Sequence, residues 1–190
     1  MYGEFFLEFI RDRRTMGAVA PSSSSLAEKM VRDTIQRGDS VVVEYGPGPG
    51  AFTREILKKI DRNTTFLAIE KNPKMAAMFK QIFPSVLLYE DSAENIPRIL
   101  GEVGESKVDC IISGLPWASF DSGYQERLLQ VTLSVLREGG TFATFSYLHS
   151  LLLPAGRSFK KKITDHFSRV KRSGTVWSNL PPAFVYRCTK

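Results

Sequence analysis

The sequence predicts an α/β protein built on a doubly wound, seven-stranded and mostly parallel sheet. The main observation is that short apolar runs alternate with longer segments of helical periodicity along the chain. Strands separated by helices pair in parallel through right-handed crossovers. A second observation concerns the C-terminal end, where the last two predicted strands are joined only by the short link "SNLPP" at 178–182. This link predicts a C-terminal antiparallel hairpin.

Each element follows from apolar runs, caps and helix terminators. A serine run offers N-caps to one early helix and Gly38 ends it, while Pro73 opens another that stops before Pro84. Strands are expected at 40–44, 65–70, 85–89, 107–113, 141–147, 167–177 and 183–188. Helices are expected at 4–14, 24–37, 51–60, 73–83, 94–101, 122–137 and 155–165, with the helix at 122–137 ending at Gly139–Gly140.

Length and composition fit one soluble domain. The 190 residues predict a single domain, 1–190, with an N-terminal helical extension at 1–38 and a core at 39–190. Hydrophobic residues make up 43% and charged residues 24%. No apolar run is long enough to span a membrane, and the N-terminus lacks the pattern of a secretion signal. We therefore expect a cytoplasmic location.

The charge and the metal-binding residue types narrow the possible partners. The formal net charge of +6 favours an anionic partner, either nucleic acid or a lipid surface. Cys110 and Cys188 form no metal or redox spacing and are expected to be free thiols in a reducing cytosol. With only two histidines and no clustered ligands, no metal site is expected.

The stretch "VVVEYGPGPGAFTREIL" at 41–57 is the most informative in the chain. Glu44, Gly46, Gly48 and Gly50 lie where the first core strand turns into a helix, and glycine lets the backbone approach a ligand closely. A dinucleotide-binding turn needs the spacing G-x-G-x-x-G, whereas these glycines strictly alternate. A phosphate-binding loop needs a lysine, which is absent from this turn.

The spacing E-x-G-x-G-x-G resembles motif I of the class I S-adenosylmethionine-dependent methyltransferases, which have a Rossmann-like fold. The resemblance implies that the turn passes under the methionine part of S-adenosyl-L-methionine, whose product is S-adenosyl-L-homocysteine. It also implies that an acid ending the second strand binds both ribose hydroxyls, which assigns Glu70, with Lys71 beside it, to the ribose. By the same resemblance, Asp91 binds the adenine amino group, and Ser92 and Ala93 supply adjacent contacts.

The loop after the fourth core strand reads "SGLPW" at 113–117 and resembles motif IV of the ribosomal RNA adenine dimethylases. That motif holds the target amine and stacks an aromatic ring on the base. The resemblance assigns Ser113 to the cofactor side, and Leu115, Pro116 and Trp117 to the substrate side. We expect Trp117 to line the site because it follows a proline at a strand end. The chain departs from the dimethylases at Ser113, where they have asparagine, and it lacks their C-terminal helical domain.

A second resemblance covers nearly the whole chain and is to the bacterial phospholipid N-methyltransferases. It rests on five segments, at 9–30, 44–53, 113–117, 145–147 and 179–187. The resemblance implies methylation of phosphatidylethanolamine or a related aminolipid. It favours Tyr147 as the group that accepts the proton of the ammonium, with His149 as a further candidate. Tyr147 and Trp117 could also surround a methylated ammonium by cation–π attraction.

Two segments suggest contact with an anionic membrane, and hence peripheral association with its inner face. Tyr2, Phe5, Phe6, Phe9 and Ile10 share one face at helical spacing, and arginines follow directly. This face could instead pack on the core or over the cofactor. The basic segment at 157–172 could touch the same headgroups, or it could be a solvated face.

The leading hypothesis is therefore an aminolipid N-methyltransferase that acts as a monomer. An RNA adenine methyltransferase, a small-molecule N-methyltransferase and a non-catalytic binding protein remain as alternatives. The combination of Glu44, the glycines, Glu70 and Asp91 argues against a non-catalytic protein.

Overall fold

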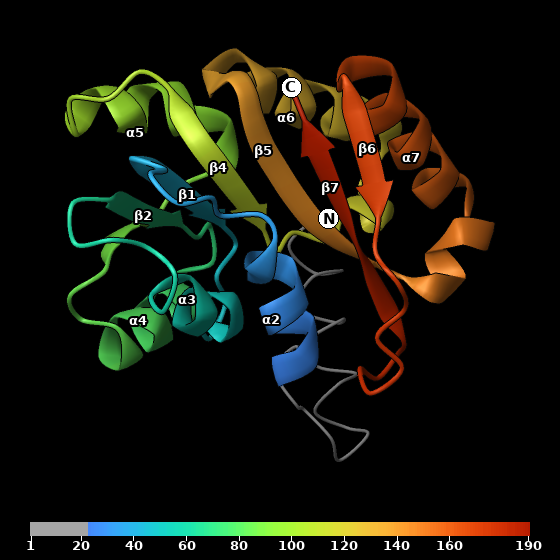
Figure 1. Ribbon diagram of the computed structural model, residues 1–190, viewed down its shortest axis with the longest axis horizontal. Coiled ribbons are helices and arrows are strands. Elements are labelled where there is room, and N and C mark those ends of the chain that lie inside the picture. Colours follow the sequence, from blue (N-terminus) through green and yellow to red (C-terminus); the bar gives the residue numbers. More distant parts are fainter. Residues whose placement is uncertain (1–22) are drawn as a thin grey trace.

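The computed structural model describes residues 23–190. The expected helix at 4–14, its aromatic face and most of the segment 9–30 lie outside the described residues. In the described part, the chain forms one seven-stranded sheet in the order β3-β2-β1-β4-β5-β7-β6, covered by helices on both faces (Figure 1). The strands are β1 (Val41–Tyr45), β2 (Thr65–Ile69), β3 (Leu87–Tyr89), β4 (Val108–Ser113), β5 (Leu136–Tyr147), β6 (Arg169–Arg172) and β7 (Ala183–Thr189).

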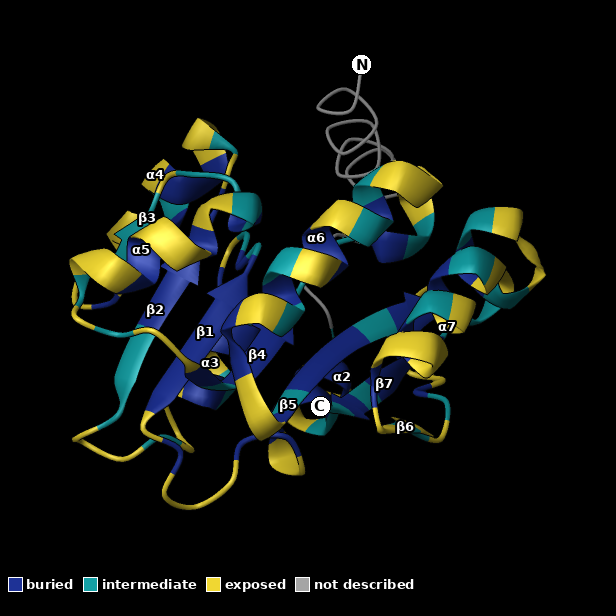
Figure 2. Cartoon of the chain, turned by 90° about the horizontal axis from the view of Figure 1, so that it is seen from above, coloured by how far each residue is buried: buried dark blue, intermediate teal, exposed yellow. Residues whose placement is uncertain are grey.

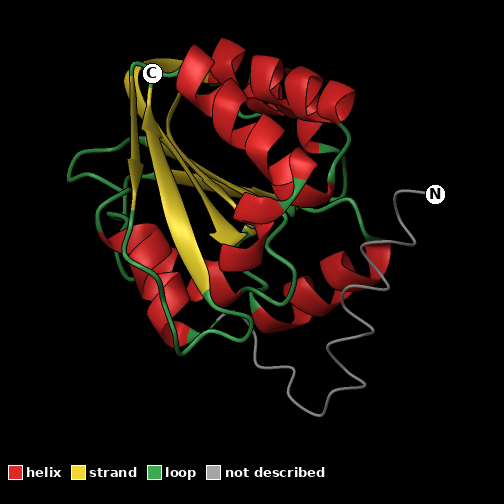
Figure 3. Cartoon of the chain, turned by 90° about the vertical axis from the view of Figure 1, so that its right-hand side faces the viewer, coloured by secondary structure: helices red, strands yellow, loops and turns green. Residues whose placement is uncertain are grey.

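The helices form two layers that enclose the sheet (Figure 3). One layer contains α2 (Ser24–Arg32), α3 (Ala51–Ile56) and α4 (Pro73–Ile82). The other contains α5 (Ile96–Glu102), α6 (Ser122–Val135) and α7 (Pro154–His166). Short 3₁₀ turns are η1 (Ala93–Asn95), η2 (Trp117–Ser119) and η3 (Leu148–Leu152). The doubly wound α/β prediction is confirmed.

The strand pairing places the switch point of the sheet between β1 and β4. Strands β1 to β5 are parallel, and β1 pairs with both β2 and β4. The chain therefore winds outward in one direction from β1 to β3 and in the other from β4 onward. In such sheets ligands bind beyond the carboxyl ends of the strands at the switch point. Figure 2 shows the central strands as largely buried, and their apolar side chains form separate clusters with the helices on the two faces of the sheet.

The predicted C-terminal hairpin is confirmed, and the structure adds its position in the sheet. Strand β7 is antiparallel to β5 and to β6, and it lies between them. Strand β6 is shorter than the predicted 167–177. Beyond Arg172, the Ser173 amide donates a hydrogen bond to the Val185 carbonyl and Val176 forms an isolated bridge to Ala183.

The boundary between α6 and β5 differs from the sequence prediction. The helix ends at Val135, and the strand begins at Leu136 rather than after the two glycines. Leu136 is fully buried and pairs with Val108, so burial of its side chain favours the extended conformation there. The register then shifts, and Gly139, at a φ of +72°, accommodates the irregularity.

Candidate cofactor site

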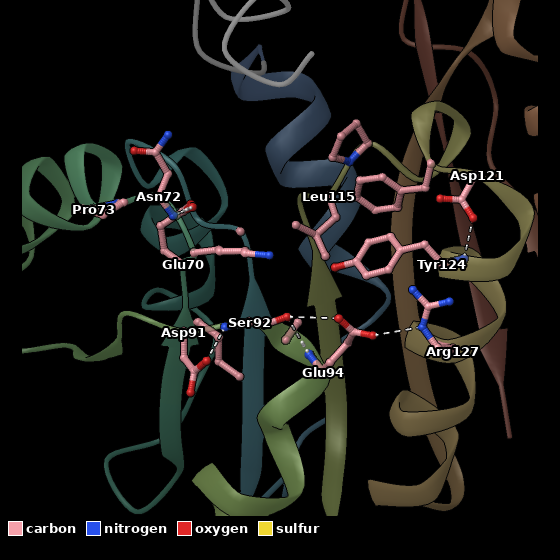
Figure 4. A pocket seen from close by; sticks show the side chains of 16 residues that line it. Glu70, Asn72, Pro73, Asp91, Ser92, Glu94, Leu115, Asp121, Tyr124 and Arg127 are labelled. Atoms are coloured by element: carbon pink, nitrogen blue, oxygen red, sulfur yellow. Dashed lines mark hydrogen bonds and ion pairs between the residues drawn. The ribbon is translucent and has the colours of Figure 1, made fainter. Parts of the chain in front are cut away.

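A cavity of about 730 Å³ lies beyond the carboxyl ends of β1, β2, β3 and β4. Its volume is within the range usual for small-molecule sites. Figure 4 shows Glu70 and Asn72 at the end of β2, with Leu115 and Tyr124 on the opposite wall. The residues that line it are Gly46, Ile69, Glu70, Lys71, Asn72, Pro73, Asp91, Ser92, Ala93, Glu94, Leu115, Pro116, Phe120, Asp121, Tyr124 and Arg127.

The first glycine of the turn, Gly46, lines this cavity. Gly46, Gly48 and Gly50 all have positive φ, at +61°, +53° and +83°, a region that side chains rarely adopt. A Cβ on Gly46 would lie 2.7 Å from Cδ2 of Leu115, and one on Gly50 would lie 2.1 Å from Cε2 of Phe83. The alternate glycines therefore serve both the backbone conformation and the close packing of the turn.

Glu44 is fully buried beneath the turn and does not line the cavity. Its Oε2 accepts a 2.6 Å hydrogen bond from the hydroxyl of Thr53 in α3. Its Oε1 has no hydrogen-bond partner among the described residues. Burial is the main reason that the pKa of this carboxyl rises to about 8.

Glu70 follows β2 and points into the cavity (Figure 4). It is only 3% exposed, and its two oxygens accept backbone hydrogen bonds from Gly48 at 3.2 Å and Asn72 at 2.9 Å. Desolvation raises the pKa of this carboxyl, and the hydrogen bonds oppose that shift. Each carboxylate oxygen has a further lone pair, so Glu70 can still accept hydrogen bonds from a ligand diol. The neighbouring Lys71 also lines the cavity and is exposed.

The third strand end supplies Asp91, Ser92 and Ala93, which also line the cavity. The Asp91 carboxylate accepts hydrogen bonds from Asn95 Nδ2 at 2.7 Å and from the Ser92 amide at 2.6 Å, and it pairs with Arg98 at 2.5 Å. The hydrogen bond from Asn95 is the largest cause of its lowered pKa. Asp91 is therefore ionised, and Ser92, Asn95 and Arg98 of α5 fix its orientation.

The loop after β4 contributes Leu115 and Pro116 to the cavity, whereas Ser113 and Trp117 lie behind it. Ser113 is fully buried, and its Oγ accepts a 2.9 Å hydrogen bond from Nε1 of Trp117. Trp117 is 1% exposed and stacks on Phe159 of α7, with ring centroids 4.9 Å apart. The expectation that Trp117 lines the substrate site is corrected here. Its indole is a core side chain because α7 covers it.

Tyr147 and His149 lie at the carboxyl end of β5, at the same edge of the sheet, but neither lines this cavity. Their rings are parallel, with centroids 5.7 Å apart and planes 6° apart. Tyr147 is 8% exposed and belongs to the apolar cluster under α2, while His149 is exposed. The structure therefore brings these two residues together, separately from the cavity that Glu70 lines.

The residues that form one wall of the cavity were not predicted from the sequence. It comprises Glu94 in η1 and Phe120, Tyr124 and Arg127 in or next to α6. Arg127 Nε lies 3.5 Å from Glu94 Oε1, and the rings of Phe120 and Tyr124 meet edge to face. Asp121 fixes the start of α6 by accepting a 2.9 Å hydrogen bond from the Tyr124 amide. The sequence signal was the i, i+3 spacing of Tyr124 and Arg127 after this cap, which places both on one helix face.

These features fit S-adenosylmethionine. The ligand needs an acceptor for its ribose hydroxyls, an apolar wall for adenine and a backbone turn that can pass beneath its amino acid part. Glu70, the side chains of Leu115 and Phe120, and the glycine turn meet these needs in one cavity of adequate size. Within residues 23–190, no group of three or more His, Cys, Asp or Glu side chains could hold a metal ion.

Solved structures share the fold of this chain. An O-methyltransferase from Bacillus cereus, solved with S-adenosylhomocysteine, superposes with a TM-score of 0.68 at 13% identity over 96% of this chain and 89% of that one. A putative rRNA methylase from Clostridium thermocellum superposes with a TM-score of 0.61 at 17% identity, covering 91% of this chain and all of that one. Together with the sequence similarity to methyltransferases described next, this fold identifies the chain as a class I S-adenosylmethionine-dependent methyltransferase.

The relatives found by sequence include methyltransferases whose names state the methyl acceptor. The chain is 28% identical over 191 aligned positions to an ornithine lipid N-methyltransferase from Singulisphaera acidiphila, covering 97% of this chain and 95% of that protein. It is 27% identical over 108 positions to the ribosomal RNA small subunit methyltransferase A of Chlorobium phaeobacteroides, covering 56% of this chain but 38% of that protein. No family profile matches the chain. No helix in residues 23–190 is long and apolar enough to cross a bilayer.

Proposed function

We propose that this methyltransferase acts on the amine of an aminolipid headgroup, of the phosphatidylethanolamine or ornithine-lipid kind, at a membrane surface. The observation that carries the proposal is the similarity to an ornithine lipid N-methyltransferase, which extends over nearly the full length of both proteins. The cavity that Glu70 lines supports a cofactor site for this reaction.

The protein's own residues bind and orient the reactants. Bound S-adenosylmethionine supplies an electrophilic methyl group on its sulfonium, and the acceptor amine attacks that methyl in line. Glu70 would hold the ribose and the glycine turn would lie under the amino acid part, while Leu115 and Pro116 form the apolar wall beside β4. Catalysis in this arrangement comes mainly from positioning and from the exclusion of water.

The acceptor amine must lose a proton before its lone pair can attack. We assign this role to the Tyr147–His149 pair because both residues lie at the carboxyl end of β5, which pairs directly with β4. An imidazole can accept a proton near neutral pH, and a stacked phenol ring holds it in a fixed orientation. The exposed position of His149 allows the proton to pass on to solvent.

An RNA adenine methyltransferase is the second candidate, favoured by the "LPW" sequence at 115–117 and by partial similarity to ribosomal RNA methyltransferases. The chain spans 26–38% of the length of these relatives. In the dimethylases the aromatic residue of this motif stacks on the target base. Here Trp117 is buried against Phe159, which speaks against that role.

The test is radiolabelled methyl transfer from S-adenosylmethionine with three acceptors offered in parallel. These are phosphatidylethanolamine and ornithine lipid, each in mixed micelles with an anionic lipid, and ribosomal RNA. Label extracted with either lipid supports the proposal and identifies the preferred headgroup. Label in RNA, with none in lipid, would overturn it in favour of the second candidate.

Two variants test the assignment of roles. Glu70→Gln should abolish labelling at low cofactor concentration, whereas Glu90→Gln, an exposed acid at the end of the next strand, is the matched control. His149→Ala should lower the rate at neutral pH more than at high pH, where more of the amine is already deprotonated. An unchanged pH profile would remove His149 from the mechanism.

A further inference from the structure

Three large apolar side chains are more exposed than any others in residues 23–190. Leu152 is 73% exposed, Trp177 72% and Leu180 78%, while the remaining exposed large apolar residues fall between 41% and 45%. Leu153, beside Leu152, is one of these, at 45%. Apolar side chains that gather on one surface mark sites of interaction with other molecules or with membranes.

These residues come from two segments that leave the sheet side by side. Leu152 lies in η3, which follows β5, while Trp177 and Leu180 lie in the β6–β7 connection. The two segments are joined where the amide of Leu148 donates a 2.9 Å hydrogen bond to the carbonyl of Pro182. Because β5 is parallel to β4 and β1, this edge is also the one at which the cofactor cavity opens. We call these four residues, Leu152, Leu153, Trp177 and Leu180, the apolar edge.

The β6–β7 connection is held in place by polar contacts, so its exposed side chains are displayed by an ordered loop. Asn179 is 3% exposed, and its Nδ2 donates a 2.6 Å hydrogen bond to the carbonyl of Pro181. Its Oδ1 accepts a 3.1 Å hydrogen bond from the Ser23 amide. Figure 1 shows this connection beside α2. Trp177 and Leu180 thus flank a buried asparagine and point away from the core.

Basic side chains are frequent in the segment that carries the apolar edge, where Lys161 and Lys162 pair with Asp165 and Glu126. Residues 148–182 contain seven lysines and arginines and one aspartate, so this segment alone has a formal charge of +6, equal to that of the whole chain. Arg157 Nε donates to the carbonyl of Leu151 at 3.3 Å, and Lys29 Nζ donates to that of Gly174 at 3.4 Å. Neither side chain pairs with a carboxylate in the described part of the chain. Exposed apolar residues with unpaired cations around them match the interface of an anionic bilayer.

We infer that the chain docks on anionic membranes through the apolar edge, with Trp177 and Leu180 entering the lipid and Lys29 and Arg157 contacting the headgroups. The inference rests on the proposed aminolipid substrate, which has to be taken from a bilayer. It adds a binding surface separate from the cofactor cavity. Docking at this edge turns the carboxyl ends of the strands, and with them the cavity mouth, toward the headgroups.

Tryptophan fluorescence of the full chain tests the inference directly. The chain has two tryptophans, Trp117 at 1% exposure and Trp177 at 72%, so only Trp177 can report a change from water to lipid. Vesicles of phosphatidylethanolamine and phosphatidylglycerol should shift the emission to shorter wavelength, and brominated lipids should quench it. Trp177→Phe should remove both effects, while vesicle co-sedimentation of that variant stays close to that of the parent.

Affinity for the same vesicles separates the apolar and the charged contributions. Trp177→Ser with Leu180→Ser should weaken co-sedimentation about tenfold or more, because each side chain loses its burial in lipid. Leu57→Ser with Ile82→Ser is the matched control, since these exposed residues end α3 and α4 toward the opposite edge. Lys29→Gln and Arg157→Gln should each cost about fivefold on anionic vesicles, and less at high salt.

The outcomes separate this inference from the proposed function. Vesicle binding and lipid methylation without a shift in Trp177 emission would overturn docking through the apolar edge. The proposed function would still be supported. Emission that is already shifted without lipid, and that depends on protein concentration, would mean that a second copy covers the edge, which also overturns the inference. A lipid-dependent shift without methyl transfer to any lipid would support the edge and overturn the aminolipid substrate.

Discussion

The hydroxyl of Thr53 donates a 2.6 Å hydrogen bond to Oε2 of Glu44, directly beneath the glycine turn. Thr53 supplies the described polar contacts of a carboxyl group that is fully buried, and Oε1 has no hydrogen-bond partner among the described residues. A buried carboxylate in this setting is costly, so the neutral acid is favoured. Burial therefore raises the pKa of Glu44 to about 8, which favours the protonated form at neutral pH.

The raised pKa of Glu44 predicts a specific dependence of stability on pH. A carboxyl whose folded pKa exceeds its unfolded value of 4.5 stabilises the fold fully below pH 4.5 and loses that contribution as pH rises toward 8. The side chain in Glu44→Gln cannot ionise. The free energy of unfolding of this variant should therefore increase relative to that of the parent as the pH rises from 4.5 to 8. The gain has an upper limit of about 5 kcal/mol.

Urea unfolding of both proteins at several pH values measures this difference. Asp165→Asn, which alters an exposed acid in an i, i+4 ion pair, controls for general effects of charge. A difference between Glu44→Gln and the parent that stays constant from pH 4.5 to 8 would show that Glu44 is ionised in the folded state.

Glu70 is predicted to contribute to cofactor affinity through its charge. Glu70→Gln keeps the size of the side chain but replaces one acceptor oxygen with a donor, which a ribose diol cannot use in the same way. A hydrogen bond to a charged group contributes about 1.5–3 kcal/mol, so the dissociation constant of S-adenosylhomocysteine should rise about 10- to 100-fold. Calorimetric titration measures it, with Glu90→Gln as the control. Equal affinity for Glu70→Gln and the parent would remove Glu70 from the ribose site.

The position of Glu70 could be predicted from the sequence because it depends on local order along the chain. An acid at the end of the second core strand faces the glycine turn whenever consecutive strands are parallel neighbours, as β1 and β2 are. The same reasoning placed Asp91 at the end of β3. The hydrogen bonds that orient Asp91, from Asn95 and Arg98, come from the helical segment that follows and were not predicted.

The prediction that Trp117 lines the site was wrong because it relied on neighbouring residues alone. An aromatic residue after a proline at a strand end can face either the cavity or the core. The choice depends here on Phe159, which α7 brings from 42 positions later in the chain. The placement of β7 between β5 and β6 could likewise not be predicted, because a hairpin at the end of a sheet can pair through either of its strands.

The three glycines of the turn are predicted to tolerate alanine unequally. All three have positive φ, which costs a residue with a side chain about 1–2 kcal/mol. At Gly48 nothing lies within 4 Å of the added Cβ, so only that cost applies. At Gly50 the Cβ would lie 2.1 Å from Phe83 Cε2, which should add about 1–3 kcal/mol.

Chemical denaturation of Gly48→Ala and Gly50→Ala tests this order. Combining Gly50→Ala with Phe83→Ala removes the clash, so the double variant should be more stable than the sum of the two single changes implies. Additive losses would mean that the glycine at position 50 is required for its backbone conformation alone.

Trp117→Phe is predicted to weaken the fold while leaving the cofactor site intact. The change removes the donor that satisfies Ser113 Oγ and leaves a small void against Phe159, which should together lower the free energy of unfolding by about 1–3 kcal/mol. Ser113→Ala in the same background should cost less than it does alone, because the hydrogen bond is already lost. Binding of S-adenosylhomocysteine should be unchanged, since neither side chain lines the cavity. If Trp117→Phe instead kept its stability and raised the KM for the lipid acceptor, the indole would belong to the substrate site and its packing against α7 would have to open during turnover.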